Sequence, residues 1–173
     1  MNKKSNKQLA KEIINREIAA LRRTTKLLDS KFERACEAIL SNKGKVITLG
    51  VGKSSFIAMK MAATLSSTGT AALFLHPLDA LHGDVGVIKK NDVVIIYSNS
   101  GETQEVIKLL PLLKLLKCCI ISITGNLSTT LARYSKISLD ASVTREACPH
   151  NLAPTSSITV SYTHLTLPTK CWG

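Results

Sequence analysis

The sequence predicts an α/β fold, in which a doubly wound, five-stranded parallel sheet is sandwiched by helices and preceded by N-terminal helices. Five short runs of mostly apolar residues alternate with stretches of helical periodicity. The runs are apolar on both faces, which is typical of parallel strands that helices cover on both sides. In chain order, the expected strands are Lys45–Leu49, Ala71–Leu75, Asp92–Tyr97, Cys118–Thr124 and Ile137–Leu139.

The helices are expected where apolar residues recur at intervals of three and four. Two of them precede the first strand, and Asn42 and Gly44 close the second. At 173 residues the chain suits a single domain, with N-terminal helices at 1–44, a core at 45–159 and a tail at 160–173. The expected helices are Leu9–Leu28, Phe32–Leu40, Lys53–Ser66 and Thr103–Leu116.

The formal charge of +11 is concentrated near the N-terminus, where residues 1–45 carry twelve Lys and Arg against five Asp and Glu. Aromatic residues make up only 4% of the chain and do not interleave with these charges. A protein that binds single-stranded nucleic acid would place stacking side chains beside the positive charge. We therefore expect a solvated helix face and no nucleic-acid partner, although a weak attraction for anionic substrates is compatible with it.

No stretch reaches the roughly 18 apolar residues that a membrane span needs, so no membrane partner is expected. Residues 8–28 are amphipathic and interrupted by charges, unlike a signal peptide. The five cysteines form no CxxC pair and no metal-ligand spacing with the four histidines. We expect a cytoplasmic protein with reduced thiols, no metal and no cofactor.

The loops after the strands are the expected place for a ligand, because open parallel sheets bind ligands at the carboxyl ends of their strands. Gly50-Val-Gly-Lys-Ser54 is not a P-loop, since Ile47 stands where the first glycine is needed, and Ser55 replaces the third glycine of a dinucleotide fingerprint. What remains is a tight turn in which backbone can approach a ligand and a lysine supplies a cation. The alternative is an ordinary strand-to-helix turn. The candidates here are Gly52, Lys53 and Ser54.

A second loop, Ser98-Asn-Ser-Gly-Glu-Thr103, follows an apolar strand and precedes a helix. Hydroxyls gathered at a helix N-terminus favour an anion, because exposed amides and the helix dipole attract negative charge there. The lack of an acidic residue before Glu102 favours a phosphate over a metal. The alternative is a capping cluster that serves only the helix. Ser98, Ser100 and Thr103 are thus candidates for phosphate binding.

Seven motifs occur in an order that resembles a known family. They are Gly50-Val-Gly-Lys-Ser54, Ser66-Ser-Thr-Gly-Thr70, His76-Pro, His82-Gly-Asp84, Ser98-Asn-Ser-Gly-Glu102, Glu146-Ala-Cys-Pro149 and Leu152-Ala-Pro-Thr-Ser156. Over roughly residues 8–159 the chain closely resembles the sugar-isomerase (SIS) domain of bacterial D-arabinose 5-phosphate isomerases. The resemblance implies a flavodoxin-like SIS fold, a homotetramer once complete, and interconversion of ribulose 5-phosphate with arabinose 5-phosphate. That product feeds octulosonate and lipopolysaccharide synthesis.

Isomerisation through an enediol needs a carboxylate or histidine near the reacting carbons and a donor or cation at the developing oxyanion. Glu105 lies one helical turn beyond the phosphate loop, and Glu146 follows the last strand. By resemblance Lys53, Glu105 and Glu146 fall on catalytic positions, and His82 faces the sugar as a positioning residue. Which glutamate is the base stays open. Taken alone, each glutamate could be a surface charge, and His82 could be structural.

Two other functions stay in view from the sequence. One is a sugar-phosphate sensor that uses the SIS fold without chemistry, although the N-terminal helices lack the short glycine turn of a helix-turn-helix. The other is a different SIS isomerase, such as a phosphoheptose or hexulose-phosphate isomerase. The retained Lys53, Glu105 and Glu146 favour the pentose isomerase.

The stretch Val160–Gly173 departs from the family, which continues there with a long helix. Its alternating β-type residues, its proline and its lack of a helical face predict a non-native tail that packs poorly. We expect that the chain lacks the family's C-terminal end, including a His-Pro-Gly-Gly loop with a catalytic histidine and, in most members, a pair of CBS domains. As it stands, the chain is expected to be inactive.

Overall fold

A computed structural model of the protein describes residues 5–166 and contains one sheet of five parallel strands in the order β2-β1-β3-β4-β5. The order places β1 and β3 side by side at the centre, so that the chain winds first toward one edge and then toward the other. The predicted fold class is confirmed. The strands are β1 (Val46–Gly50), β2 (Ala72–Phe74), β3 (Val93–Tyr97), β4 (Cys119–Thr124) and β5 (Ile137–Asp140).

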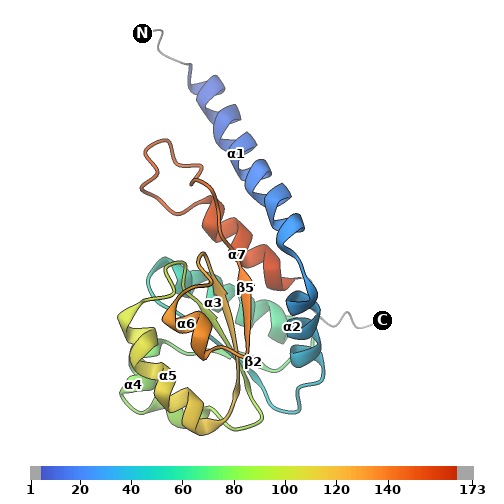
Figure 1. Ribbon diagram of the computed structural model, residues 1–173, viewed down its shortest axis with the longest axis vertical. Coiled ribbons are helices and arrows are strands. Elements are labelled where there is room, and N and C mark those ends of the chain that lie inside the picture. The colour runs from blue at the N-terminus through green and yellow to red at the C-terminus, as the bar shows by residue number, and fades with distance from the viewer. Residues whose placement is uncertain (1–4, 167–173) are drawn as a thin grey trace.

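Helices cover both faces of the sheet (Figure 1). One face packs against α1, α2, α3 and α7, and the other against α4, α5 and α6. The predicted helices are present with small shifts at their ends, while the five-residue helices α4 and α6 were not predicted. The helices are α1 (Asn6–Leu27), α2 (Ser30–Leu40), α3 (Lys53–Ser67), α4 (Pro77–Leu81), α5 (Gln104–Leu116), α6 (Thr130–Tyr134) and α7 (Ser156–Thr166), with a short 3-10 helix η1 (Asp84–Val87).

The central strands are buried along their whole length, as their apolar sequence requires. On β3 the side chains alternate between the two faces, so that Ile95 and Tyr97 join the core with α3 and α7 while Val94 and Ile96 join the core with α5. The register pairs Gly50 with Tyr97. The carboxyl ends of β1 and β3 therefore lie next to each other, and so do the loops that follow them.

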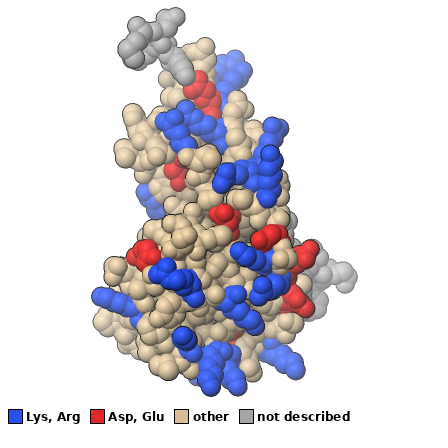
Figure 2. Space-filling view, viewed as in Figure 1, with Lys and Arg blue, Asp and Glu red and all other residues tan. Residues whose placement is uncertain are grey.

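The helix α1 begins at a capping box, in which Ser5 and Gln8 each bond the other's backbone N–H. It extends beyond the sheet and runs alongside α7 (Figure 1). Basic side chains lie over α1 and over the body of the molecule, with acidic and uncharged surface among them on the face shown in Figure 2. Among the helices between residues 5 and 166, none combines the length and the apolarity that crossing a membrane requires.

The structure corrects the expectation for the residues after Thr159. Helix α7 continues through Val160, which is fully buried, to Thr166. His164 is also buried, and its Nδ1 lies 2.9 Å from the Val160 carbonyl oxygen. β-branched residues lower helix propensity by only about 0.7 kcal/mol or less each, and packing against α1 and α3 outweighs that preference here. The prediction of poor packing was wrong for these residues, and 167–173 lie outside the described part of the chain.

Candidate functional site

A cavity of about 450 Å³ opens at the carboxyl ends of β1 and β3. Its volume lies within the range of about 300–1,000 Å³ that small-molecule sites occupy. Three segments form its walls: the start of α3, the loop between β3 and α5, and the first two turns of α7. The polar side chains that line it are Lys53, Ser54, Tyr97, Ser98, Asn99, Ser100, Thr103, Ser157 and Ser161.

The loop between β3 and α5 is held by its own hydroxyls. Ser98 is buried, and its Oγ accepts a hydrogen bond of 3.1 Å from the Gly101 N–H. Gly101 has a φ of 66°, where glycine is favoured, and a side chain there would collide with Thr129. Ser100 Oγ accepts from the Glu102 N–H at 3.3 Å. These bonds fix the loop with its hydroxyls gathered at the start of α5.

The side chain of Thr103 does not cap the helix that it precedes. Thr103 is the N-cap residue of α5, but it makes no side-chain hydrogen bond to the first turn. Its Oγ1 instead lies 2.9 Å from Ser98 Oγ. The capping alternative therefore does not account for Thr103, and the first-turn amides of α5 are not taken up by it. Amides at a helix start attract anions.

The turn between β1 and α3 brings a cation to the same cavity. Gly52 has a φ of 58°, and a Cβ on it would meet nothing within 4 Å, so the backbone angle and not the space selects glycine. Gly52 is the N-cap of α3 and offers no capping side chain. Lys53 is exposed and lines the cavity together with Ser54. Lys53 and the hydroxyls of the loop between β3 and α5 therefore line the same cavity.

Glu146 holds the start of α7. Its Oε2 accepts hydrogen bonds from the Thr155 N–H at 2.8 Å, the Thr155 hydroxyl at 3.2 Å and the Ser157 N–H at 3.2 Å. Partial burial raises the pKa of this carboxyl, but the hydrogen bonds from Ser157 and Thr155 outweigh it and keep the pKa below its ordinary value. Glu146 is not among the residues that line the cavity. Its carboxylate is thus a cap for α7 in this structure.

The structure brings some of the predicted residues together and leaves others apart. Lys53, Ser54, Ser98, Ser100 and Thr103 line one cavity, whereas Gly52, which precedes Lys53, is not among its lining residues. Glu105 lies half-buried on the first turn of α5, and His82 is exposed at the C-cap of α4. Like Glu146, neither of them lines the cavity. The catalytic roles of Glu105 and Glu146, and the positioning role of His82, stay predictions.

Several lining residues were missed from the sequence. Tyr97 ends β3, and its place within an apolar strand predicted only a core side chain. Ser157 and Ser161 stand four residues apart on one side of α7. The i, i+4 spacing of these serines would have placed them on one side of a helix. This spacing could not be used as a signal from the sequence, because no helix was expected after Thr159.

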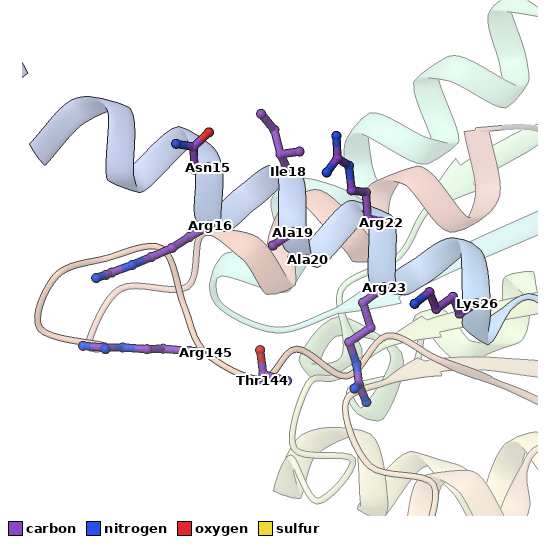
Figure 3. Close-up of a pocket in the computed structure, with 10 residues that line it drawn as sticks. All are labelled: Asn15, Arg16, Ile18, Ala19, Ala20, Arg22, Arg23, Lys26, Thr144 and Arg145. Carbon is purple, nitrogen blue, oxygen red and sulfur yellow. The ribbon is translucent and has the colours of Figure 1, made fainter. Parts of the chain in front are cut away.

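A larger cavity of about 760 Å³ lies between α1 and the loop after β5 (Figure 3). Arg16 and Arg145 extend in the same direction there, and Arg23 donates a hydrogen bond of 3.3 Å to Ser142 Oγ. No residue of the β1 or β3 loops lines this groove. Within residues 5–166 no cluster of three metal-ligating side chains occurs. The cavity at the strand ends is the better candidate site, because open parallel sheets bind ligands at the carboxyl ends of their strands.

The fold and this site define the class of protein: a doubly wound parallel α/β domain with a hydroxyl-lined cavity at the carboxyl ends of its central strands. The SIS domain family model matches residues 39–167, and the chain belongs to that family. The match begins in α2 and reaches the end of the described α7. The family resemblance predicted from the motifs is confirmed.

Known relatives agree with this assignment. Over 130 residues the chain is 55% identical to the arabinose 5-phosphate isomerase KdsD of Pseudomonas aeruginosa, and the match covers 75% of this chain and 40% of the relative. It is 51% identical to KdsD of Francisella tularensis over 88% of this chain and 47% of the relative. The structure of the E. coli CFT073 c3406 protein in complex with arabinose 5-phosphate superposes with a TM-score of 0.87 at 40% identity, covering 94% of this chain and 87% of that one. The chain thus spans less than half the length of these two curated relatives.

Proposed function

We propose that this chain is the SIS domain of an aldose–ketose isomerase that interconverts ribulose 5-phosphate and arabinose 5-phosphate. The observation that carries the proposal is the placement of a hydroxyl loop, an α5 start that Thr103 does not cap, and the Lys53 ammonium around one cavity. The similarity to the E. coli CFT073 protein, whose structure holds arabinose 5-phosphate, supports the choice of sugar phosphate.

The phosphate binds at the start of α5 in this proposal. The hydroxyls of Ser98, Ser100 and Thr103 surround that helix end, and the positive end of the helix dipole favours a dianion there. Neutral hydroxyl donors bind a phosphate without adding a charge that would need its own partner. Fixing the phosphate sets which carbons of the sugar reach the other end of the cavity.

The chemistry moves a proton between neighbouring carbons. A base takes the proton from the hydroxyl-bearing carbon next to the carbonyl while the carbonyl oxygen gains a proton, which gives the enediol. The former carbonyl carbon then receives a proton while the other hydroxyl loses one and becomes the new carbonyl. The two carbons exchange oxidation level within one molecule, so the reaction consumes no external oxidant or reductant. Lys53 is the cation that stabilises the developing oxyanion. Glu105 and Glu146 are the base candidates, and His82 is assigned to positioning the substrate.

A second candidate function is a sugar-phosphate-binding module without chemistry. The observation that favours it is that neither Glu105 nor Glu146 lines the cavity. Such a module would use the same phosphate loop and the same Lys53. Another SIS isomerase, such as a phosphoheptose isomerase, would also use them and would differ in the sugar that it accepts.

We propose in addition, from the family resemblance, that the intact protein is a cytoplasmic homotetramer whose product feeds lipopolysaccharide synthesis. The same resemblance groups residues 1–44 with the core at 45–159 and makes residues 160–173 a non-native tail, although the match to the family model extends to residue 167 and α7 continues to Thr166. These statements stay predictions.

The test is to incubate ribulose 5-phosphate with this chain and with a version extended by a family-type C-terminal helix and histidine loop, following arabinose 5-phosphate by NMR. Turnover by either protein supports the isomerase. Calorimetric binding of arabinose 5-phosphate without turnover by either protein supports the binding module. If neither protein binds the sugar phosphate, both functions are refuted.

A further inference from the structure

Tyr97, the last residue of β3, is a buried residue that carries a polar hydroxyl group. The side chain is 1% exposed, and within the described residues its hydroxyl has no hydrogen-bond partner. Leaving a buried hydroxyl unpaired is costly, and buried polar groups in folded proteins nearly always have a partner. Tyr97 also lines the cavity at the strand ends. The missing partner can therefore be a group that enters that cavity.

The position of the ring shows which part of a ligand it would meet. Tyr97 packs in the core on the α3 and α7 face of the sheet, whereas α5 covers the opposite face. The same cavity is also lined by Ile57 of α3 and Ser161 of α7, the helices that cover that face. The hydroxyl loop leads away toward α5. A phosphate at the start of α5 would thus place the rest of the sugar phosphate, and not the phosphate itself, on the Tyr97 side.

The protonation state of Tyr97 suits hydrogen bonding to a neutral sugar. Burial, followed by the neighbouring Tyr162, raises the pKa of the Tyr97 phenol far above its ordinary value. The group therefore stays a neutral O–H that can donate and accept. Tyr162 differs, because its hydroxyl lies 3.5 Å from Thr64 Oγ1.

We propose that the Tyr97 hydroxyl forms a hydrogen bond with a hydroxyl of the substrate's carbon chain, and thereby helps to select a polyhydroxylated phosphate over phosphate alone. The inference rests on the proposed function, since it assumes that a sugar phosphate occupies this cavity. It assigns to Tyr97 the positioning of the sugar, and no step in proton transfer.

The test compares Tyr97→Phe, Ser100→Ala and the wild-type chain by calorimetric titration with arabinose 5-phosphate and with inorganic phosphate. Tyr97→Phe keeps the ring and removes only the hydroxyl. We expect it to bind arabinose 5-phosphate about three- to tenfold more weakly, the range for one neutral hydrogen bond, and to bind inorganic phosphate as the wild type does. Ser100→Ala should bind both ligands more weakly.

Ser156→Ala is the matched control. Ser156 is fully buried and its hydroxyl is likewise unpartnered within the described residues, but it does not line the cavity. Without ligand, both variants should melt at or above the wild-type temperature, because each loses an unsatisfied buried hydroxyl, and only Tyr97→Phe should lose sugar-phosphate affinity. Equal affinity of wild type and Tyr97→Phe for arabinose 5-phosphate would overturn the assignment of Tyr97. Failure of both the wild-type chain and its C-terminally extended version to bind arabinose 5-phosphate would refute the proposed function as well.

Discussion

Glu146 offers a direct way to separate a structural role from a catalytic one. Glu146→Ala removes the oxygen that accepts two backbone N–H groups and one hydroxyl at the start of α7. Loss of a helix-capping side chain costs about 0.5–2 kcal/mol. Glu146→Gln keeps an oxygen acceptor but loses the negative charge at the helix N-terminus, which is worth about 0.3–1 kcal/mol. We therefore expect the free energy of unfolding to fall in the order wild type, Glu146→Gln, Glu146→Ala.

The lowered pKa of Glu146 determines how the stability changes with pH. The pKa of Glu146 in the folded chain is lower than its ordinary value of 4.5. The stability that the ionised group contributes is therefore present above about pH 4.5 and is lost as the pH falls through the lower, folded-state pKa. The difference in unfolding free energy between the wild type and Glu146→Gln should shrink on acidification through that window.

The measurement is urea unfolding, followed by circular dichroism, at pH 7 and at several values below 4.5. Binding of arabinose 5-phosphate is titrated on the same proteins. A cap that only holds α7 predicts lower stability for both variants and little change in affinity for Glu146→Gln. If Glu146→Ala unfolded at the same urea concentration as the wild type, the capping argument would be refuted. If the stability were unchanged while Glu146→Gln in the C-terminally extended version lost its turnover, Glu146 would have a catalytic role.

Three further predictions concern the site and the chain end. Ser100→Ala should weaken arabinose 5-phosphate binding by about 1–3 kcal/mol, the range for a hydrogen bond to a charged group, and unchanged affinity by calorimetry would remove Ser100 from the phosphate site. Lys53→Met in the C-terminally extended version should lower turnover by ~10²-fold or more, the effect of losing one electrostatic stabiliser, and wild-type turnover would exclude Lys53 from the mechanism. The chain as it stands should show little turnover beside the extended version, and comparable, measurable turnover from both proteins would refute this expectation.

The central strands β1 and β3 were predictable because burial on both faces leaves a continuous run of mostly apolar residues. The hydroxyl loop was predictable for a similar reason: Ser98 to Thr103 lie between a strand and a helix that each have a clear pattern. The five-residue helices α4 and α6 were not, because they are too short to show a helical period.

The rest of the site depends on contacts between distant segments. Thr103 occupies the capping position, and only the geometry shows that its hydroxyl turns to Ser98 instead. Glu146 reaches residues 155 and 157 across a loop whose path no local pattern fixes. Tyr97 was predicted only as part of an apolar strand, because the sequence cannot show that its hydroxyl lacks a hydrogen-bond partner within the described residues. Helix α7 was misjudged because tertiary packing overrides the weak helix preference of its β-branched residues.

The contact between α1 and α7 has a consequence for synthesis. The two helices pack together although 128 residues separate Leu27 from Ser156. At about 5–20 residues per second, translation of that interval takes roughly 6–26 s. During that time the inner side of α1, including Ala20 and Leu21, has emerged from the ribosome before α7 can pack beside it. The nascent chain therefore passes through a stage in which an apolar face of α1 is open to water and the cavity at the strand ends still lacks the wall that α7 forms.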